Sequence, residues 1–304
     1  MSGNSFQKDN EKFFDLYHDA LRRKHKDGRV FWVESNYSGS STYWSGRRIE
    51  AALPTIASAI DKCTASRGDV ILVPGFHAET VTAAISLSKI GIQLIGLPVG
   101  NLYPTITGNG TIDALSIDAA DCVVENLAFG APSTDEQTAM INIAAANAIV
   151  KGIRGIGSQT AKNVVDCITL TAAANDCFIT DVELWNTVVA VNSFLSFEGA
   201  ASRVVIKNFF AHGNVATAGV IDAAAVTGLF LEDVRVAVVG TTKPAATLDS
   251  NPTGMARNCF FAGTHATLAT NANLGNAMRC DNIKVLEETD NSVSAAIIPA
   301  VDTD

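Results

Sequence analysis

Ile179-Thr180-Asp181-Val182 is one copy of a short pattern that recurs from residue 124 to residue 283. Each copy reads apolar, polar, then Asn, Asp or Gly, then apolar, and successive copies are 24 to 29 residues apart. Asn, Asp and Gly tolerate a left-handed backbone conformation, so the third position of each copy predicts a sharp corner between two short strands. The predicted corners are Asn126, Gly152, Asp181, Asn208, Asp233, Asn258 and Asn282.

A strand, a corner and a second strand at near-constant spacing predict one coil of a right-handed parallel β-helix. The residues beside each corner are β-branched or aromatic and alternate in polarity, as strands do. An apolar spacing of two excludes helical repeats, and the leucine framework of leucine-rich repeats is absent. We therefore expect an all-β chain with an N-terminal helical arm or cap over residues 1–28, the β-helix over 29–288 and an extended tail over 289–304.

The alternation also predicts which side chains face the core. Around the first corner we expect Val124 and Leu127 to point inward and Val123 and Glu125 to point outward, with Cys122 and Phe129 inward and Ala128 outward. Equivalent residues of successive coils stack about 4.8 Å apart. The outward position before the corner then forms a row of charges with mostly alternating sign, which predicts surface ion pairs. This row is Glu125, Lys151, Thr180, Lys207, Glu232, Arg257 and Asp281.

A second outward row is apolar, and this is unusual for the surface of a soluble protein. We expect it to be covered by a loop or by another subunit, and we interpret it as an oligomer interface, most simply of a trimer. The alternative is an error of one residue in the assignment of faces, which would turn the row into the core. The row is Val123, Ile149, Phe178, Val205, Phe230 and Met255.

The composition excludes several classes of protein. Of the 304 residues, 17% are charged and 47% are hydrophobic, which is not the composition of a disordered chain. The net charge of −9 argues against nucleic acid as a partner, because phosphate recognition needs concentrated positive charge. The longest uncharged stretch, from residue 90 to 112, contains two prolines and five glycines and predicts no membrane span. The six cysteines have no metal-ligand spacing, so we expect buried free thiols, no metal and no cofactor.

Positive charge is concentrated at the start of the chain. Residues 1–50 hold nine Lys and Arg against seven Asp and Glu, and the remainder has a net charge of −11. The basic run of Arg22, Arg23, Lys24 and Lys26 is expected as a solvated helix end, and docking on an acidic partner, the capsid, is the functional hypothesis for it. The first thirty residues are polar and predict no secretory signal.

The region before the repeats contains the segments Val30-Phe31-Trp32-Val33-Glu34-Ser35, Leu53-Pro54-Thr55-Ile56, Gly68-Asp69-Val70-Ile71-Leu72-Val73-Pro74-Gly75 and His77-Ala78-Glu79-Thr80. In this order they resemble the opening of pectin-lyase-like β-helix proteins of tailed phages, often encoded among the head genes. The resemblance covers roughly residues 29–288. It implies a virion structural protein, either a head decoration or cement protein or a spike.

Chemistry has few candidate residues. Among the acids considered, Asp181 and Asp233 occupy corners, Glu183 lies beside Arg154, and Asp166 and Asp176 form no stacked pair of carboxylates. His77 and Glu79 could form an acid–base pair, but a structural turn is the preferred interpretation. His212 and His265 are expected in loops. Trp32 and Trp185 are expected in the core or an interface, and Trp44 at the surface.

These observations predict a non-enzymatic virion protein, a homotrimer bound to the major capsid protein on the capsid exterior and made in the bacterial cytoplasm. It would stabilise the head from outside. The alternative is a tail spike or fibre-type protein that binds a receptor or degrades a polysaccharide. Such spikes usually need a longer chain, so length favours decoration.

Overall fold

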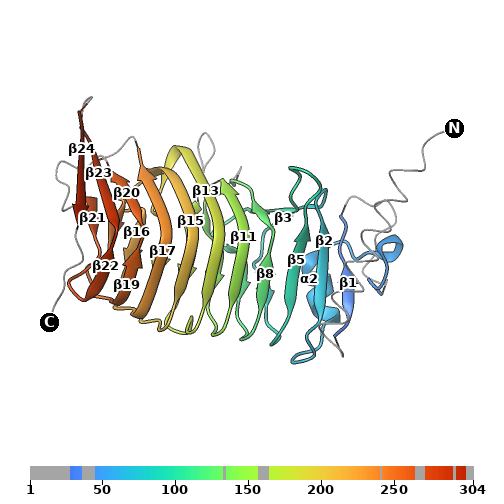
Figure 1. Ribbon diagram of the computed structural model, residues 1–304. Coiled ribbons are helices and arrows are strands. Elements are labelled where there is room, and N and C mark those ends of the chain that lie inside the picture. Colours follow the sequence, from blue (N-terminus) through green and yellow to red (C-terminus); the bar gives the residue numbers. More distant parts are fainter. Residues whose placement is uncertain are drawn as a thin grey trace.

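The computed structural model describes residues 28–35, 45–132, 135–156, 164–239, 242–263, 271–289 and 292–298. In these residues the chain is a parallel β-helix whose coils stack along one axis, with the N-terminal and C-terminal coils at opposite ends (Figure 1). The fold class predicted from the corner pattern is therefore confirmed. The basic run and the rest of residues 1–27 lie outside the described part of the chain.

Two parallel sheets make up the coils. The larger sheet follows the order β1 (Val30–Trp32), β2 (Val70–Pro74), β5 (Gln93–Leu97), β8 (Val123–Glu125), β11 (Ile149–Ile156), β13 (Phe178–Val191), β15 (Val205–Val215), β17 (Thr227–Val238), β20 (Phe260–Gly263), β23 (Ile283–Thr289) and β24 (Ser292–Ile298). Joined to it are β3 (Ala78–Val81), β6 (Thr105–Gly108), β9 (Ala128–Phe129), β19 (Thr253–Arg257) and β22 (Met278–Asp281).

The second sheet has one strand from each of eight coils. Its strands are β4 (Ile85–Leu87), β7 (Asp113–Ile117), β10 (Gln137–Ile143), β12 (Val164–Leu170), β14 (Ser193–Phe197), β16 (Val220–Asp222), β18 (Ala246–Thr247) and β21 (Ala272–Asn273).

All seven predicted corners have a left-handed backbone, with φ between 47° and 66°. Neighbouring corners also bond to one another: the Asn208 amide donates to Asp181 Oδ1 at 3.1 Å, and the Asn282 amide donates to Asn258 Oδ1 at 2.8 Å. Gly152 is the one corner without a side chain. A Cβ placed there would lie 2.3 Å from Oδ1 of Asn126, so the amide of the preceding coil occupies the space that a side chain would need.

A second column of left-handed residues lies five positions before these corners, and the sequence pattern did not reveal it. Its φ values run from 54° to 69°. The column includes Arg203, a residue type that rarely adopts this conformation. The Arg203 guanidinium forms an ion pair with Asp176 in the coil before it, which holds the corner in place. The members of the column are Asp121, Asn147, Asp176, Arg203 and Gly228.

The inward positions fill one continuous core. Val124 and Leu127 are fully buried, as predicted, and the equivalent residues of later coils join them in a single apolar cluster. The six cysteines are free and buried. Burial raises the pKa of Cys63 to about 12 and that of Cys259 to about 11, so these thiols stay protonated and act as small core side chains.

Both ends of the stack carry extra structure. At the N-terminal end, the segment after the short 3₁₀ helix η1 (Ile49–Ala51) bonds to the free edge of β1 through Leu53 N–H to Trp32 O at 2.8 Å. The helix α2 (Ile56–Lys62) follows, capped by Thr55. At the C-terminal end, β24 pairs antiparallel with β23. In the tail expected from residue 289, the residues Ser292–Ile298 thus form a strand along the edge of the last coil.

Replacing Gly152 by alanine should destabilise the protein by about 1–3 kcal/mol, because a Cβ at positive φ is strained and would collide with the Asn126 amide. Urea unfolding measures the change. The matched variant Asp233→Gly at an equivalent corner should cost much less, since glycine adopts this conformation freely. Equal losses in the two variants would contradict this account of the corner.

Candidate functional site

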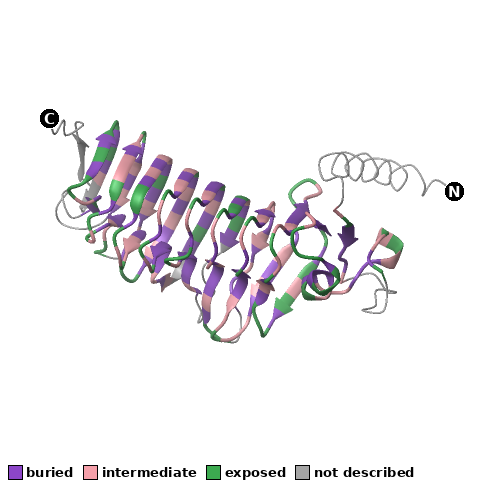
Figure 2. Ribbon diagram, turned by 90° about the horizontal axis from the view of Figure 1, so that it is seen from below, coloured by how far each residue is buried: buried purple, intermediate pink, exposed green. Residues whose placement is uncertain are grey.

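The outward apolar row of Val123, Ile149, Phe178, Val205, Phe230 and Met255 lies in register across six strands. Buried and less buried residues alternate along the strands, which fixes the face assignment (Figure 2). None of the six side chains is buried, and Ile149 is 39% exposed. The alternative of a one-residue error in phase is therefore wrong. We call this set the apolar row.

The charged row runs beside the apolar row and neutralises itself within the chain. Lys207 Nζ lies 2.6 Å from Glu232 Oε2, and Arg257 forms an ion pair with the other oxygen of Glu232. Lys207 Nζ also lies 5.5 Å from the centroid of the Phe230 ring, and the Arg257 guanidinium carbon lies 5.7 Å from it. The expected pairing of stacked charges is thus observed.

The same face is apolar in the first coils, and there the chain itself covers it. Val30 and Val70 are in line with the apolar row, and Trp32 and Leu72 are in line with the charged row. All four are buried, in a cluster that includes Ala52 of the segment folded over β1. The face is therefore covered at the N-terminal end and accessible from Val123 onward in the described chain.

The acids considered as catalytic candidates have structural partners. The Asp176 carboxylate is paired with Arg203, which lowers its pKa. Asp166 accepts hydrogen bonds from Asn192 at 3.0 Å and from Ser193 at 2.5 Å. Asp181 bonds to the corner amide of the next coil, and Asp233 is itself a corner. Glu183 lies 3.7 Å from Arg154, as expected.

A different set of carboxylates, on or beside the second sheet, was not singled out in the sequence. Partial burial and the charge of Asp118 raise the pKa of Asp113, whose carboxylate accepts a hydrogen bond from Asn142 at 2.9 Å. Partial burial and the charge of Asp249 raise the pKa of Asp222. Like charges at this side of the coils therefore repel one another at neutral pH.

His77 holds the first coil to the N-terminal strand. Its Nδ1 accepts a hydrogen bond from the backbone N–H of Ser35 at 3.0 Å, and its Nε2 lies 3.2 Å from Glu79 Oε2. The same carboxylate oxygen accepts the N–H of Ile56 in the first turn of α2. Both ring nitrogens are thus engaged and the ring is buried, which agrees with a structural turn.

Trp185 was expected in the core or in an interface, and the core position is wrong. Its side chain is 41% exposed on the outward face of β13. The indole N–H donates to Glu183 at 3.0 Å, and its ring lies 5.2 Å from Phe210 and 5.5 Å from His212. His212 lies in strand β15, where it is in register with Trp185 and Ala237 of the two adjacent strands, so the loop expected for it is wrong. Trp32 is buried, and Trp44 and His265 lie outside the described residues.

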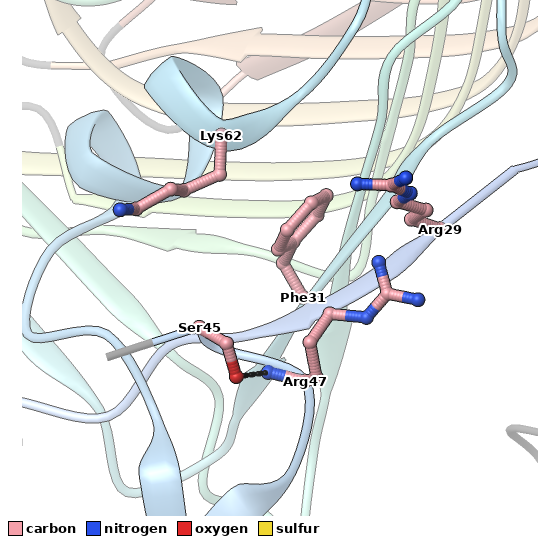
Figure 3. Close-up of a pocket in the computed structure, with 5 residues that line it drawn as sticks. All are labelled: Arg29, Phe31, Ser45, Arg47 and Lys62. Atoms are coloured by element: carbon pink, nitrogen blue, oxygen red, sulfur yellow. Dashed lines mark hydrogen bonds between the residues drawn. The ribbon is translucent and has the colours of Figure 1, made fainter. Parts of the chain in front are cut away.

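A cavity of about 520 Å³ lies at the N-terminal end of the stack (Figure 3). Among the described residues, Arg29, Phe31, Ser45, Arg47 and Lys62 line it, and three of these five side chains are cations. The Arg47 guanidinium carbon is 5.6 Å from the centroid of the Phe31 ring. The backbone N–H of Arg47 donates a hydrogen bond to Ser45 Oγ at 3.3 Å. We call it the cationic pocket. It brings together residues 33 positions apart that no sequence motif connects.

Among the residues that the structure describes, no three His, Cys, Asp or Glu side chains gather in a group suited to a metal ion. The helices of that same part are too short or too polar to cross a membrane.

No protein-family model matches this chain, and no curated protein matches its sequence. A solved structure titled rhamnogalacturonan lyase superposes on it with a TM-score of 0.56 and 10% sequence identity. The match covers 90% of this chain and 80% of that chain. At this identity the likeness shows the fold alone, and that fold is the parallel β-helix of pectin-lyase-like proteins.

Replacing Asp113 or Asp222 by asparagine should stabilise the protein at pH 7. A carboxyl whose pKa is raised on folding contributes stability below its ordinary pKa of about 3.8 and loses that contribution as the pH rises through the folded value. The gain from the substitution should therefore shrink as the pH falls toward 4. Urea unfolding between pH 4 and pH 7 measures it.

Asp176→Asn is the matched control for this pH series. Arg203 lowers the pKa of the Asp176 carboxyl, so the substitution should destabilise the protein at pH 7. The loss of stability should become smaller as the pH falls. The same sign for all three variants would contradict the assignment.

Proposed function

We propose that this chain is a non-enzymatic virion structural protein of a tailed phage, of the head decoration or cement type. In this proposal three copies associate through the apolar row and bind the major capsid protein on the outside of the shell. The observation that carries it is the apolar row itself. The apolar row stays accessible over six coils, whereas in the first coils the segment that contains Ile49 and Ala52 packs on the same face.

The geometry of the row suits contact with an identical row. Six side chains at about 4.8 Å per coil span about 24 Å along the axis of the stack. Three copies with parallel axes would bring their rows together in a closed ring, and most homo-oligomers have closed symmetry. The adjacent charges of Lys207, Glu232 and Arg257 are already paired within each chain, so burying this part of the row would not leave these three charges without partners.

The assignment to a phage head rests on the resemblance of residues 30–80 to phage β-helix proteins and on charge. The net charge of −11 beyond residue 50 suits a position outside the shell and away from DNA. The basic run at Arg22, Arg23, Lys24 and Lys26 would then dock on the acidic shell. These contacts would hold neighbouring capsid subunits together against the pressure of the packaged genome.

A spike or fibre-type protein that degrades a polysaccharide is the second candidate. It is favoured by the likeness to a lyase structure and by the carboxylates with raised pKa, Asp113 and Asp222. It ranks second because the acids first considered for catalysis are engaged in corners, ion pairs and hydrogen bonds, which leaves them no free role as a base or nucleophile.

The oligomer is tested by sedimentation of the wild type and of Phe178→Asp. The wild type should sediment as a trimer, and the variant as a monomer, because a carboxylate in the centre of the row would have to be buried unpaired. Phe210→Asp, on a different outward face, is the control and should stay trimeric. A monomeric wild type would overturn the interface.

Catalysis is tested by incubating the protein with pectic and other acidic polysaccharides, with and without calcium. No new reducing ends and no unsaturated products should form. Turnover that is lost in Asp176→Ala, Asp181→Ala or Asp113→Asn would replace the structural function by the second candidate.

A further inference from the structure

Two other cations at this end of the stack, Arg67 and Lys89, are engaged within the fold. Arg67 is paired with Asp69, through Nε at 2.6 Å and Nη2 at 2.5 Å. The Nζ of Lys89 donates to the carbonyls of Ile60, Asp61 and Cys63 at the end of α2. These two side chains have their partners inside the fold, and neither of them lines the cavity.

The carboxylate of Asp69, which pairs with Arg67, has no hydrogen-bonding capacity left for the pocket. Besides Arg67, its oxygens accept the backbone N–H groups of Arg29 and Thr64, both at 2.7 Å. Its pKa lies below the ordinary value, since these hydrogen bonds and the Arg67 charge outweigh the effect of burial. The carboxylate therefore fixes the backbone at Arg29 while its charge is taken up by Arg67.

The side chains of Arg29, Arg47 and Lys62 reach the cavity from three different elements (Figure 3). Arg29 precedes β1, Arg47 precedes η1, and Lys62 is the last residue of α2. Three cations that line one cavity raise the local positive potential in a chain with a net charge of −9. Such a site favours an anion over any neutral or cationic ligand.

We propose that the cationic pocket binds carboxylates of a short acidic peptide segment on a partner protein. This rests on the proposed function, in which the partner is an acidic shell, and it adds a docking site within the folded part of the chain. A cavity of about 520 Å³ is larger than one small ion needs, and guanidinium groups match carboxylates in two-point hydrogen bonds. A long polyanion would meet the −11 charge of the following coils, whereas a short segment would meet the pocket alone.

The test measures binding of a fluorescein-labelled hexaglutamate peptide to the full chain by fluorescence anisotropy at low salt. Arg29→Gln and Lys62→Gln should each weaken binding about tenfold, the loss typical of one charge-assisted hydrogen bond. Both residues are at the surface, and the Arg29 backbone keeps its bond to Asp69, so the variants should fold. Binding should also weaken steeply with added salt.

The matched controls are Lys243→Gln and Lys284→Gln, exposed lysines of later coils. They should bind the peptide as the wild type does. An equal loss in pocket and control variants would reduce the effect to net charge and overturn the site. Competition by millimolar inorganic phosphate as strong as by unlabelled peptide would show a small-anion site, and would overturn the peptide.

The outcome is separable from that of the proposed function. Trimer formation depends on the apolar row and is read by sedimentation of the same variants. If Lys62→Gln remains trimeric and still binds hexaglutamate as the wild type does, the pocket inference fails while the interface stands. If the wild type is monomeric but the pocket variants lose the peptide, the proposed trimer interface fails while the pocket inference stands.

Discussion

The left-handed corner at one fixed position of each coil is the constraint on which the rest of the structure depends. At Asn126 and its six equivalents the backbone turns within one residue, so two strands of the larger sheet meet at an angle without a loop between them. Because every coil turns at the same place, equivalent residues fall above one another. The stacking then converts a one-residue conformational preference into continuous ladders of corner amides, core side chains and surface ion pairs.

The strict alternation of faces follows from this registration, and it separates two kinds of chemistry. Inward positions are filled mainly by apolar side chains and small thiols, with a few hydrogen-bonded polar side chains such as Asn186. Outward positions are free to vary, and there the chain places opposite charges in adjacent coils on one row and apolar side chains on the next. In such a fold, residues that form one surface patch come from equivalent positions of successive coils and not from one short sequence motif.

This explains which features could be predicted. The corners, the inward residues and the charged row depend on short-range spacing, which the sequence displays directly, and the structure confirms them. The column of Asp121, Asn147, Asp176, Arg203 and Gly228 has the same kind of signal, but Arg203 breaks the pattern of residue types and hides it. Its left-handed backbone is tolerated because of an ion pair with the neighbouring coil, and a single sequence does not show that pairing.

The features that could not be predicted depend on contacts between distant segments. The cationic pocket needs the fold of residues 46–53 across the edge of β1, which places Arg47 near Arg29 and Lys62. The aromatic contacts of Trp185 are with Phe210 and His212, which lie one coil away. The carboxylates Asp113 and Asp222 become notable only because partial burial and like charges raise their pKa values, a property of the assembled surface.

The two ends of the stack have a consequence for how such a chain can change its length in evolution. One end is finished by the segment that bonds to β1, and the other by a strand that runs in the opposite direction. Everything between them is a series of interchangeable units, each joined only to its neighbours. Duplication or loss of one coil would therefore leave both ends intact and change the length of the stack by about 4.8 Å. In the proposed oligomer the extent of the lateral contact surface would change in the same step, so gene length alone would alter the strength of association.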